Sequence, residues 1–245
     1  MPDPLQRILG LLAAGLTLPL LAALAAAVRL ETPGPAVYAA TRIGDGGRPF
    51  TCFKLRTMAW RPASGGPALT VAGDARLTRV GRLLRRFRLD ELPQLWNVAR
   101  GEMRLVGPRP EDPAFVDLGQ PLHRAVFTAR PGMTGLTQLF YADETARLDT
   151  ADPERHYREV VLPAKLRLDA AYLRHRSPEL DLWILAQTPR ALAGRRIELP
   201  STLAAELGPA AEPGPAAEVS PAAEVSPAAE VGATAELGAK AGLPT

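Results

Sequence analysis

"RLDELPQLWNVARGEMRLVGPRPE", residues 88–111, places two acids side by side, Asp90 and Glu91, just ahead of Pro93. Apolar residues recur at helical spacing over residues 89–99, so we predict a helix there that begins at the acids. Proline is favoured in a first helical turn, and carboxylates there meet the positive end of the helix dipole. One interpretation is therefore that the acids cap a helix on a solvated face.

The alternative interpretation of Asp90 and Glu91 is chemical. A carboxylate can act as a nucleophile toward a phosphoryl group, and Mg²⁺ is bound by one or two carboxylates together with substrate phosphates. The same stretch ends in Pro108-Arg109-Pro110, where two prolines restrict an arginine that could present a forked guanidinium to a phosphate. A surface turn is the other explanation of this arginine.

Short strands are predicted at residues 36–43 and 49–58, on either side of a glycine-rich turn. Residues 122–128 fit a short strand or a helix. Helical periodicity predicts further helices, and these cover residues 77–87, 153–176 (interrupted near Pro163) and 181–192. The predicted fold class is α/β, in a helix-dominated α+β arrangement. The sequence contains no phosphate-binding glycine loop and no dinucleotide fingerprint.

The N-terminal run Ile8–Val28 holds 21 residues without a charge. A helix of that length is about 31 Å long, close to the thickness of the hydrocarbon core. On these residues alone three interpretations stay open: a cleaved signal peptide, a single spanning helix and a re-entrant hairpin. Pro19 would bend or break the helix. Arg7 and Arg29 put positive charge on both flanks, which favours both ends lying in the cytoplasm.

Residues 201–245 differ from the rest of the chain, because they contain no aspartate, arginine or aromatic residue and repeat the unit Pro-Ala-Ala-Glu. We predict a disordered tail. Six glutamates and one lysine give it a net charge of −5, which leaves +8 on residues 1–200 of a chain with net charge +3. A basic body indicates anionic partners such as phosphates, nucleic acid or acidic lipid. The single cysteine, Cys52, excludes an internal disulfide framework.

Four blocks of the sequence resemble the bacterial sugar transferases, the monotopic phosphoglycosyl transferases that begin lipid-linked glycan assembly. The blocks occur in the family's order and at comparable spacing, and together they extend the resemblance over residues 8–192. They are "TPGPAVYAATRIGDGGRPFTCFKLRTM" (32–58), "RLDELPQLWNVARGEMRLVGPRPE" (88–111), "RPGMTGLTQL" (130–139) and "LPAKLRLDAAYLRHRSPELDLWIL" (162–185).

The resemblance implies a domain organisation and a location. Residues 1–31 would form a re-entrant membrane helix hairpin broken near Pro19. Residues 32–200 would form a small cytoplasmic catalytic domain with a short β-hairpin, and residues 201–245 the tail. The protein would be monotopic, in contact with inner-membrane lipid on the cytoplasmic face of the bacterial inner membrane.

The resemblance also implies a reaction. Asp90 would attack the β-phosphorus of a nucleoside diphosphate sugar, with uridine as the family's usual base. A nucleoside monophosphate would leave, and an aspartyl-phosphosugar intermediate would remain. A polyprenyl (undecaprenyl) phosphate would then take the phosphosugar, which initiates exopolysaccharide, O-antigen or glycoprotein glycan assembly. Glu91, with Asp90, would bind Mg²⁺.

Further residues are implied to bind substrate phosphate or nucleotide, namely Pro108, Arg109, Pro110, Lys54, Arg56 and Arg42. We expect the basic setting to favour the charged form of Asp90. For the cations of the two predicted strands, a solvated strand face is the other explanation.

The sequence departs from the family pattern at four positions. Arg88 stands where Ser or Thr is usual, so an expected helix cap is missing. Ala40 replaces a usual Gln, Leu18 replaces the Ser that often precedes the hairpin proline, and Thr137 replaces a common Trp or Ala. These departures leave Asp90, Glu91 and Arg109 intact, and they bear on sugar specificity and on the polar stabilisation of the hairpin.

Two other function classes compete with the enzyme. One is an inactive, membrane-attached family member with a regulatory or scaffold role. The other is a nucleic-acid binder, which would bind DNA with a steep salt dependence; it gives no reason for Asp90-Glu91, so we expect no nucleic-acid partner. The sugar, the nucleotide, the glycan pathway and a homo-oligomeric state stay open.

Overall fold

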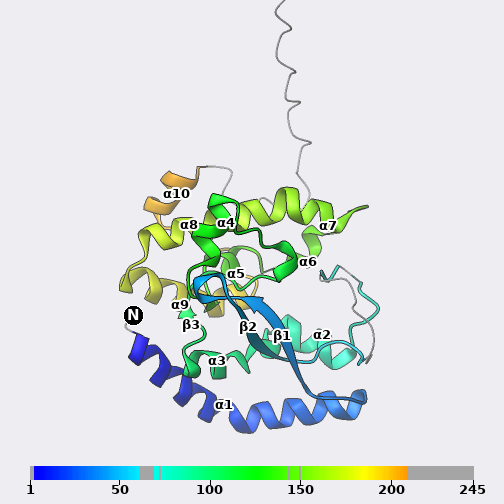
Figure 1. Ribbon diagram of the computed structural model, residues 1–245. Coiled ribbons are helices and arrows are strands. Elements are labelled where there is room, and N and C mark those ends of the chain that lie inside the picture. Colours follow the sequence, from blue (N-terminus) through cyan, green and yellow to red (C-terminus); the bar gives the residue numbers. More distant parts are fainter. Residues whose placement is uncertain (1–2, 61–68, 72, 143, 149, 209–245) are drawn as a thin grey trace, which may run out of the picture.

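The computed structural model describes residues 3–60, 69–71, 73–142, 144–148 and 150–208. Helices dominate the described chain, and the strands form two small sheets of two strands each. One long apolar helix lies along the lower edge of the molecule in Figure 1, beneath the remaining elements. The predicted helix-dominated, mixed architecture is therefore confirmed.

The N-terminal helix α1 (Asp3–Glu31) is long and apolar enough to cross a membrane by length and composition. Its outer face exposes large apolar side chains, and Leu16 is 84% exposed. Pro19 lies inside α1, and Figure 1 shows that the helix bends between its two halves. The Thr17 hydroxyl donates to the carbonyls of Ala13 (2.7 Å) and Ala14 (3.3 Å), in the turn that precedes the proline, and back-bonding of this kind often bends helices. α1 is thus one bent helix, and two separate hairpin limbs are not seen.

The N-terminal half of α1 is fastened to the body by ions and by close packing. The Asp3 carboxylate pairs with Arg104 (2.6 Å) and Arg130 (3.0 Å). Gly10 faces helix α3 (Gln94–Arg100) so closely that a Cβ atom there would lie 2.8 Å from Val98 Cγ1. A larger residue at this position would push the two helices apart.

The C-terminal end of α1 is capped by Arg56, a buried side chain that follows strand β2 (Pro49–Leu55). Its Nε donates to the Pro35 carbonyl (2.7 Å), and Nη2 donates to the carbonyls of Thr32 (2.9 Å) and Val28 (3.4 Å). Nη1 donates to the Thr32 hydroxyl and to the Met58 carbonyl. Arg56 therefore satisfies the carbonyls that a helix end leaves without partners.

The predicted β-hairpin is confirmed. Strand β1 (Val37–Ile43) pairs antiparallel with β2, and the turn between them contains the short helix Asp45–Gly47. Strand β2 ends at Leu55, three residues before the predicted end, because the chain there turns to place Arg56 against α1. The predicted basic helix is α2 (Arg79–Arg86), whose cap is the Thr78 hydroxyl.

The pattern predicted that Asp90 and Glu91 lie in the first turn of an α-helix, and the structure differs from this prediction. They lie in a separate 3₁₀ turn, Leu89–Glu91, and α3 begins only after Pro93. Arg88 precedes that turn in the left-handed conformation (φ 51°) and its side chain makes no capping hydrogen bond. A left-handed residue reverses the direction of the chain, so the acids turn inward instead of continuing α2.

A second, parallel strand pair was not predicted. Strand β3 (Arg104–Val106) pairs with β4 (Gly132–Thr134), and the larger hydrophobic core forms around this pair and the C-terminal helices. The predicted helix at 153–176 has its interruption at a π-helical turn, Tyr157–Val161, and Pro163 occupies the first turn of the next helix. The remaining helices are α4 (Pro121–Phe127), α5 (Leu136–Phe140), α6 (Glu144–Arg147), α7 (Pro153–His156), α8 (Leu162–His175) and α9 (Pro178–Leu192).

The folded body extends beyond the predicted boundary at residue 200. Residues Ser201–Leu207 form helix α10, and Leu203, 1% exposed, packs into the larger core. Glu206 pairs with Arg174 and His175 at the end of α8. The tail was predicted from its composition and repeats, and these do not show that a single leucine, Leu203, packs into the core. The rest of the predicted tail, 209–245, lies outside the described residues.

Leu203→Ala is expected to lower the free energy of unfolding by about 2–4 kcal/mol, because a leucine buried in a core leaves a cavity when truncated. Thr202→Ala, one residue earlier and exposed, is the matched control and is expected to change stability little. Urea denaturation of both variants measures the difference. Equal stability of the two would mean that α10 is not part of the folded body.

Candidate active site

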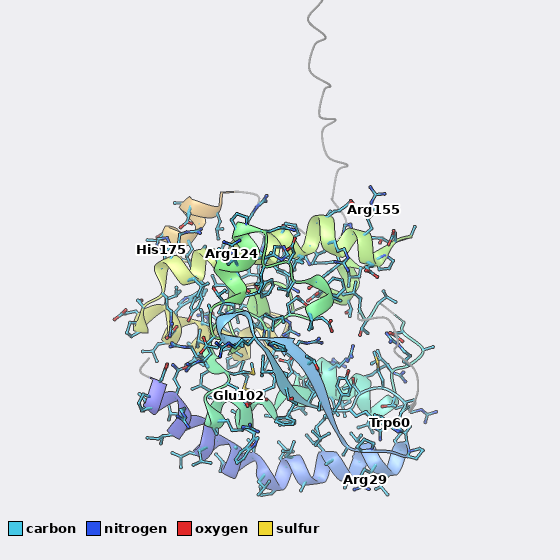
Figure 2. All side chains as sticks on the ribbon, viewed as in Figure 1. Arg29, Trp60, Glu102, Arg124, Arg155 and His175 are labelled. Atoms are coloured by element: carbon cyan, nitrogen blue, oxygen red, sulfur yellow. The ribbon has the colours of Figure 1, made fainter. Side chains whose placement is uncertain are left out.

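A cleft of about 1090 Å³ runs between the β-hairpin, α2, the 3₁₀ turn and the C-terminal helices. Asp90 and Glu91 line it together with Lys54, Arg109 and Arg42. Trp60, labelled in Figure 2, also lines the cleft and packs against Gly34, just past the end of α1. The structure therefore brings the predicted acids and most of the predicted cations to one place.

Glu91 is buried and forms ion pairs with two cations of the cleft. Its Oε1 accepts from Lys54 Nζ (3.2 Å) and from Arg109 Nη2 (3.3 Å). Burial alone would raise the pKa of Glu91, but Lys54, Arg109 and Arg88 outweigh that effect and hold the pKa well below its ordinary value. Glu91 is thus ionised, and it joins β2 to the Pro-Arg-Pro turn.

Asp90 is as buried as Glu91, yet it forms no ion pair with a described residue. Burial and the neighbouring charge of Glu91 raise the pKa of Asp90, and Lys54 and Arg85 only partly oppose this. The nearby cations thus favour the charged form of Asp90, as expected, but in the protein alone burial and the charge of Glu91 outweigh them. Asp90 is left as a carboxyl group that a cationic partner would stabilise as an anion.

The turn Pro108-Arg109-Pro110 is fixed by backbone contacts. The Gly132 amide donates to the Pro108 carbonyl (2.8 Å), and the Arg109 amide donates to Asp169 Oδ2 (3.2 Å). Glu91 and other carboxylates raise the pKa of Arg109 although burial opposes this. The guanidinium is thus a fixed, permanent charge beside Glu91.

Asp169, on α8, is a site residue that sequence reasoning missed. It is buried, its Oδ1 has no hydrogen-bond partner among the described residues, and burial raises its pKa to about 6. It lies 60 residues from Arg109 in the chain. The only sequence signal was its place within the fourth block of the family resemblance.

A second buried cluster, also missed, lies beside the Pro-Arg-Pro turn. Lys165 Nζ contacts the Tyr157 hydroxyl (2.7 Å), Glu144 (3.1 Å) and Glu111 (3.4 Å), and the Tyr157 hydroxyl donates to Glu111. Glu111 directly follows Pro110, so the cluster holds the far end of the turn. Tyr157 begins the π-helical turn, a distortion that is frequent at functional sites.

Three other predicted residues lie in different surroundings. Arg42 lines the cleft and forms an ion pair with Asp112, next to the Pro-Arg-Pro turn. Arg56 touches the cleft wall, but its donors are occupied by the end of α1, as described above. Pro19 lies in α1, away from the cleft lining.

The described residues contain no cluster of three or more His, Cys, Asp or Glu side chains that could enclose a metal ion. A Mg²⁺ ion held jointly with substrate phosphates needs only one or two carboxylates. Asp90, buried without an ion-pair partner, and its neighbour Glu91 fit that smaller requirement.

The sequence of the chain is similar to one protein family and to several named proteins. The family described as bacterial sugar transferase matches residues 3–195. The UDP-glucose:undecaprenyl-phosphate glucose-1-phosphate transferase of Caulobacter vibrioides is 49% identical over 56% of this chain and 54% of its own length. The UDP-N-acetylgalactosamine-undecaprenyl-phosphate N-acetylgalactosaminephosphotransferase of Aeromonas hydrophila is 35% identical over 71% of this chain and 39% of its own length.

The uncharacterized sugar transferase EpsL of Bacillus subtilis is 34% identical over 74% of this chain and 82% of its own length. The match spans about half the length of the Caulobacter relative and about two fifths of the length of the Aeromonas relative. The match to the family covers most of the chain, from the start of α1 to the end of α9. This protein belongs to the bacterial sugar transferase family.

Proposed function

We propose that the protein transfers a sugar-1-phosphate from a UDP-sugar to a polyprenyl phosphate such as undecaprenyl phosphate. The observation that carries the proposal is that two adjacent buried acids differ in their ion pairs. Glu91 is ionised and held by two cations, whereas Asp90 lines the same cleft with no ion-pair partner among the described residues. The printed names of the Caulobacter and Aeromonas relatives describe transfers of this kind.

In the first step, a carboxylate oxygen of Asp90 attacks the β-phosphorus of the UDP-sugar. The bond between the β-phosphorus and the bridging oxygen breaks, and uridine monophosphate leaves with that electron pair. Asp90 then carries the phosphosugar as an acyl phosphate. Arg109, fixed by its amide contact to Asp169, offers a preorganised charge to the phosphate oxygens.

In the second step, an oxygen of the polyprenyl phosphate attacks the phosphorus held on Asp90. A diphosphate bond forms, the bond between phosphorus and the Asp90 oxygen breaks, and the free carboxylate returns. Lys54 and Arg109 keep Glu91 ionised and in place throughout. A Mg²⁺ ion held by Asp90 and Glu91 would neutralise phosphate charge.

We also propose that α1 inserts into the cytoplasmic leaflet of the inner membrane and returns to the same side. Both ends of α1 are attached to the folded body, by Asp3 at one end and by Arg56 at the other. Its outward leucines are exposed, and a mid-helix proline with a nearby Thr hydroxyl supports a bend within lipid. This position would keep the cleft close to a lipid phosphate at the membrane surface.

Asp90→Asn is expected to abolish the covalent phosphosugar adduct and the release of uridine monophosphate, because an amide cannot act as the nucleophile. Intact-protein mass spectrometry of detergent-solubilised protein mixed with UDP-sugars, without lipid acceptor, measures the adduct. Asp45→Asn, at an exposed acid of the hairpin turn, is the matched control and should still form it. An adduct of normal yield on Asp90→Asn would reject Asp90 as the nucleophile.

Arg109→Lys is expected to slow turnover by about 10²-fold, because one ammonium cannot reproduce the forked contacts of a guanidinium.

Glu91→Gln should slow turnover and also raise the Mg²⁺ concentration that gives half the maximal rate. Arg155→Lys and Glu154→Gln, on exposed α7, are the controls. Unchanged Mg²⁺ dependence in Glu91→Gln would remove Glu91 from the proposed metal site.

The proposed topology predicts that both ends of α1 face the cytoplasm. Single cysteines introduced at Pro4 and Pro35, both exposed, should resist a membrane-impermeant maleimide in intact cells and react after permeabilisation. The parent protein, whose one cysteine is buried, supplies the background. Labelling of either position in intact cells would mean that α1 spans the membrane.

A further inference from the structure

Arg85, on α2, lines the same cleft as Asp90 and was not singled out by the sequence. Its Nε donates to the Thr57 hydroxyl (3.0 Å), and this contact holds the guanidinium by one of its three nitrogens. Its two Nη groups donate to no acceptor among the described residues. Arg76, which lines the cleft nearby, contrasts with it, because the Arg76 guanidinium is bound to Asp74 (2.6 Å).

The charge of Arg85 is poorly compensated. The side chain is partly buried, and burial lowers its pKa, with Asp90 the largest of the opposing influences. It nevertheless forms no ion pair with a described residue. Removing a charge from water without a partner is costly, and a phosphate could take up four unused N–H donors of a guanidinium in the forked geometry that the two groups share.

Arg85 and Arg109 reach the acids from different elements. Arg109 contacts Glu91 from the Pro-Arg-Pro turn, whereas Arg85 acts on Asp90 from α2. Another face of α2 packs on α1, where Val80 and Leu84 share a hydrophobic cluster with Val28. Figure 1 likewise shows α2 above the C-terminal half of α1. Arg85 therefore approaches Asp90 from the side of the apolar helix.

We infer that Arg85 binds the phosphate of the lipid acceptor and holds it for attack on the phosphosugar carried by Asp90. This inference rests on the proposed function. In the step concerned, the lipid phosphate oxygen forms a bond to the phosphosugar phosphorus, and the Asp90 oxygen leaves as a carboxylate. Two anionic phosphate groups must come together in that step, and Arg85 supplies a positive charge between them that Glu91 has not already engaged.

The test separates the two half-reactions in Arg85→Lys, with Arg86→Lys as the matched control. Arg86 is the next residue of α2, is exposed and does not line the cleft. Adduct formation from UDP-sugar alone is expected to stay within about threefold of the wild-type rate, whereas discharge of the preformed adduct by polyprenyl phosphate is expected to slow about 10²-fold, the usual effect of losing a positioned donor. Arg86→Lys should match the wild type in both.

A second variant guards against a folding defect in the first. Thr57→Val keeps the guanidinium and removes only the acceptor of Nε, so it should slow discharge about tenfold, as expected for the loss of one hydrogen bond. Normal discharge in both Arg85→Lys and Thr57→Val would overturn the inference. Slow adduct formation with normal discharge would also overturn it, and would assign Arg85 to the diphosphate of the UDP-sugar.

Failure of the covalent mechanism can be recognised separately. If the wild-type protein turns over without an adduct, the apparent KM values still decide the role of Arg85: Arg85→Lys should raise the value for polyprenyl phosphate and leave that for UDP-sugar unchanged. If no turnover is found at all, calorimetry replaces the KM measurement: it compares the binding of a short polyprenyl monophosphate by the wild type and by Arg85→Lys. Equal binding by the two proteins would overturn the inference.

Discussion

The burial of two adjacent carboxylates is the constraint on which the rest of the structure depends. Neighbouring buried anions repel each other and lose hydration, so at least one of them needs fixed cations. Glu91 finds them 37 residues earlier, at Lys54, and 18 residues later, at Arg109. The hairpin, the 3₁₀ turn and the Pro-Arg-Pro turn must therefore meet at one point. The parallel strand pair and the buried Asp169 hold the last of these in place.

The same constraint separates the two acids by role. Because burial and the charge of Glu91 outweigh the nearby cations, the pKa of Asp90 is raised and its charged form is disfavoured until another positive group arrives, whereas the cations around Glu91 lower the pKa of that acid. Arg85 is in the complementary condition, since its cation is partly buried and has no carboxylate bound to it. A cleft that holds one carboxyl group and one cation, neither of them in an ion pair with a described residue, suits the anionic substrate and the nucleophilic attack proposed above.

Local signals in the sequence predicted what local interactions determine. The β-hairpin and α2 follow from a glycine turn, from alternation and from helical spacing. The four family blocks pointed to the acids and to Arg109, which line one cleft. The three-residue strands β3 and β4 carry too little pattern to be recognised, because their pairing joins residues 28 apart, as at Arg104 and Gly132. Arg56 was expected to bind phosphate, since a sequence does not reveal that its acceptors are carbonyls at Val28 and Thr32. Lys165 was missed for the same reason, as its partners Glu111, Glu144 and Tyr157 come from three separate segments of the chain.

The attachment of α1 at both of its ends has a mechanical consequence. A rod fixed at one point can pivot, but a rod fixed at two points cannot change its tilt without breaking a contact. Asp3 and Gly10 fix one half of α1, and Arg56 fixes the other. If α1 rests in the bilayer as proposed, the contacts between α1 and the folded body set the height and the orientation of the cleft above the lipid surface. Lipid substrates of different chain length would then present their phosphates to the cleft at the same level.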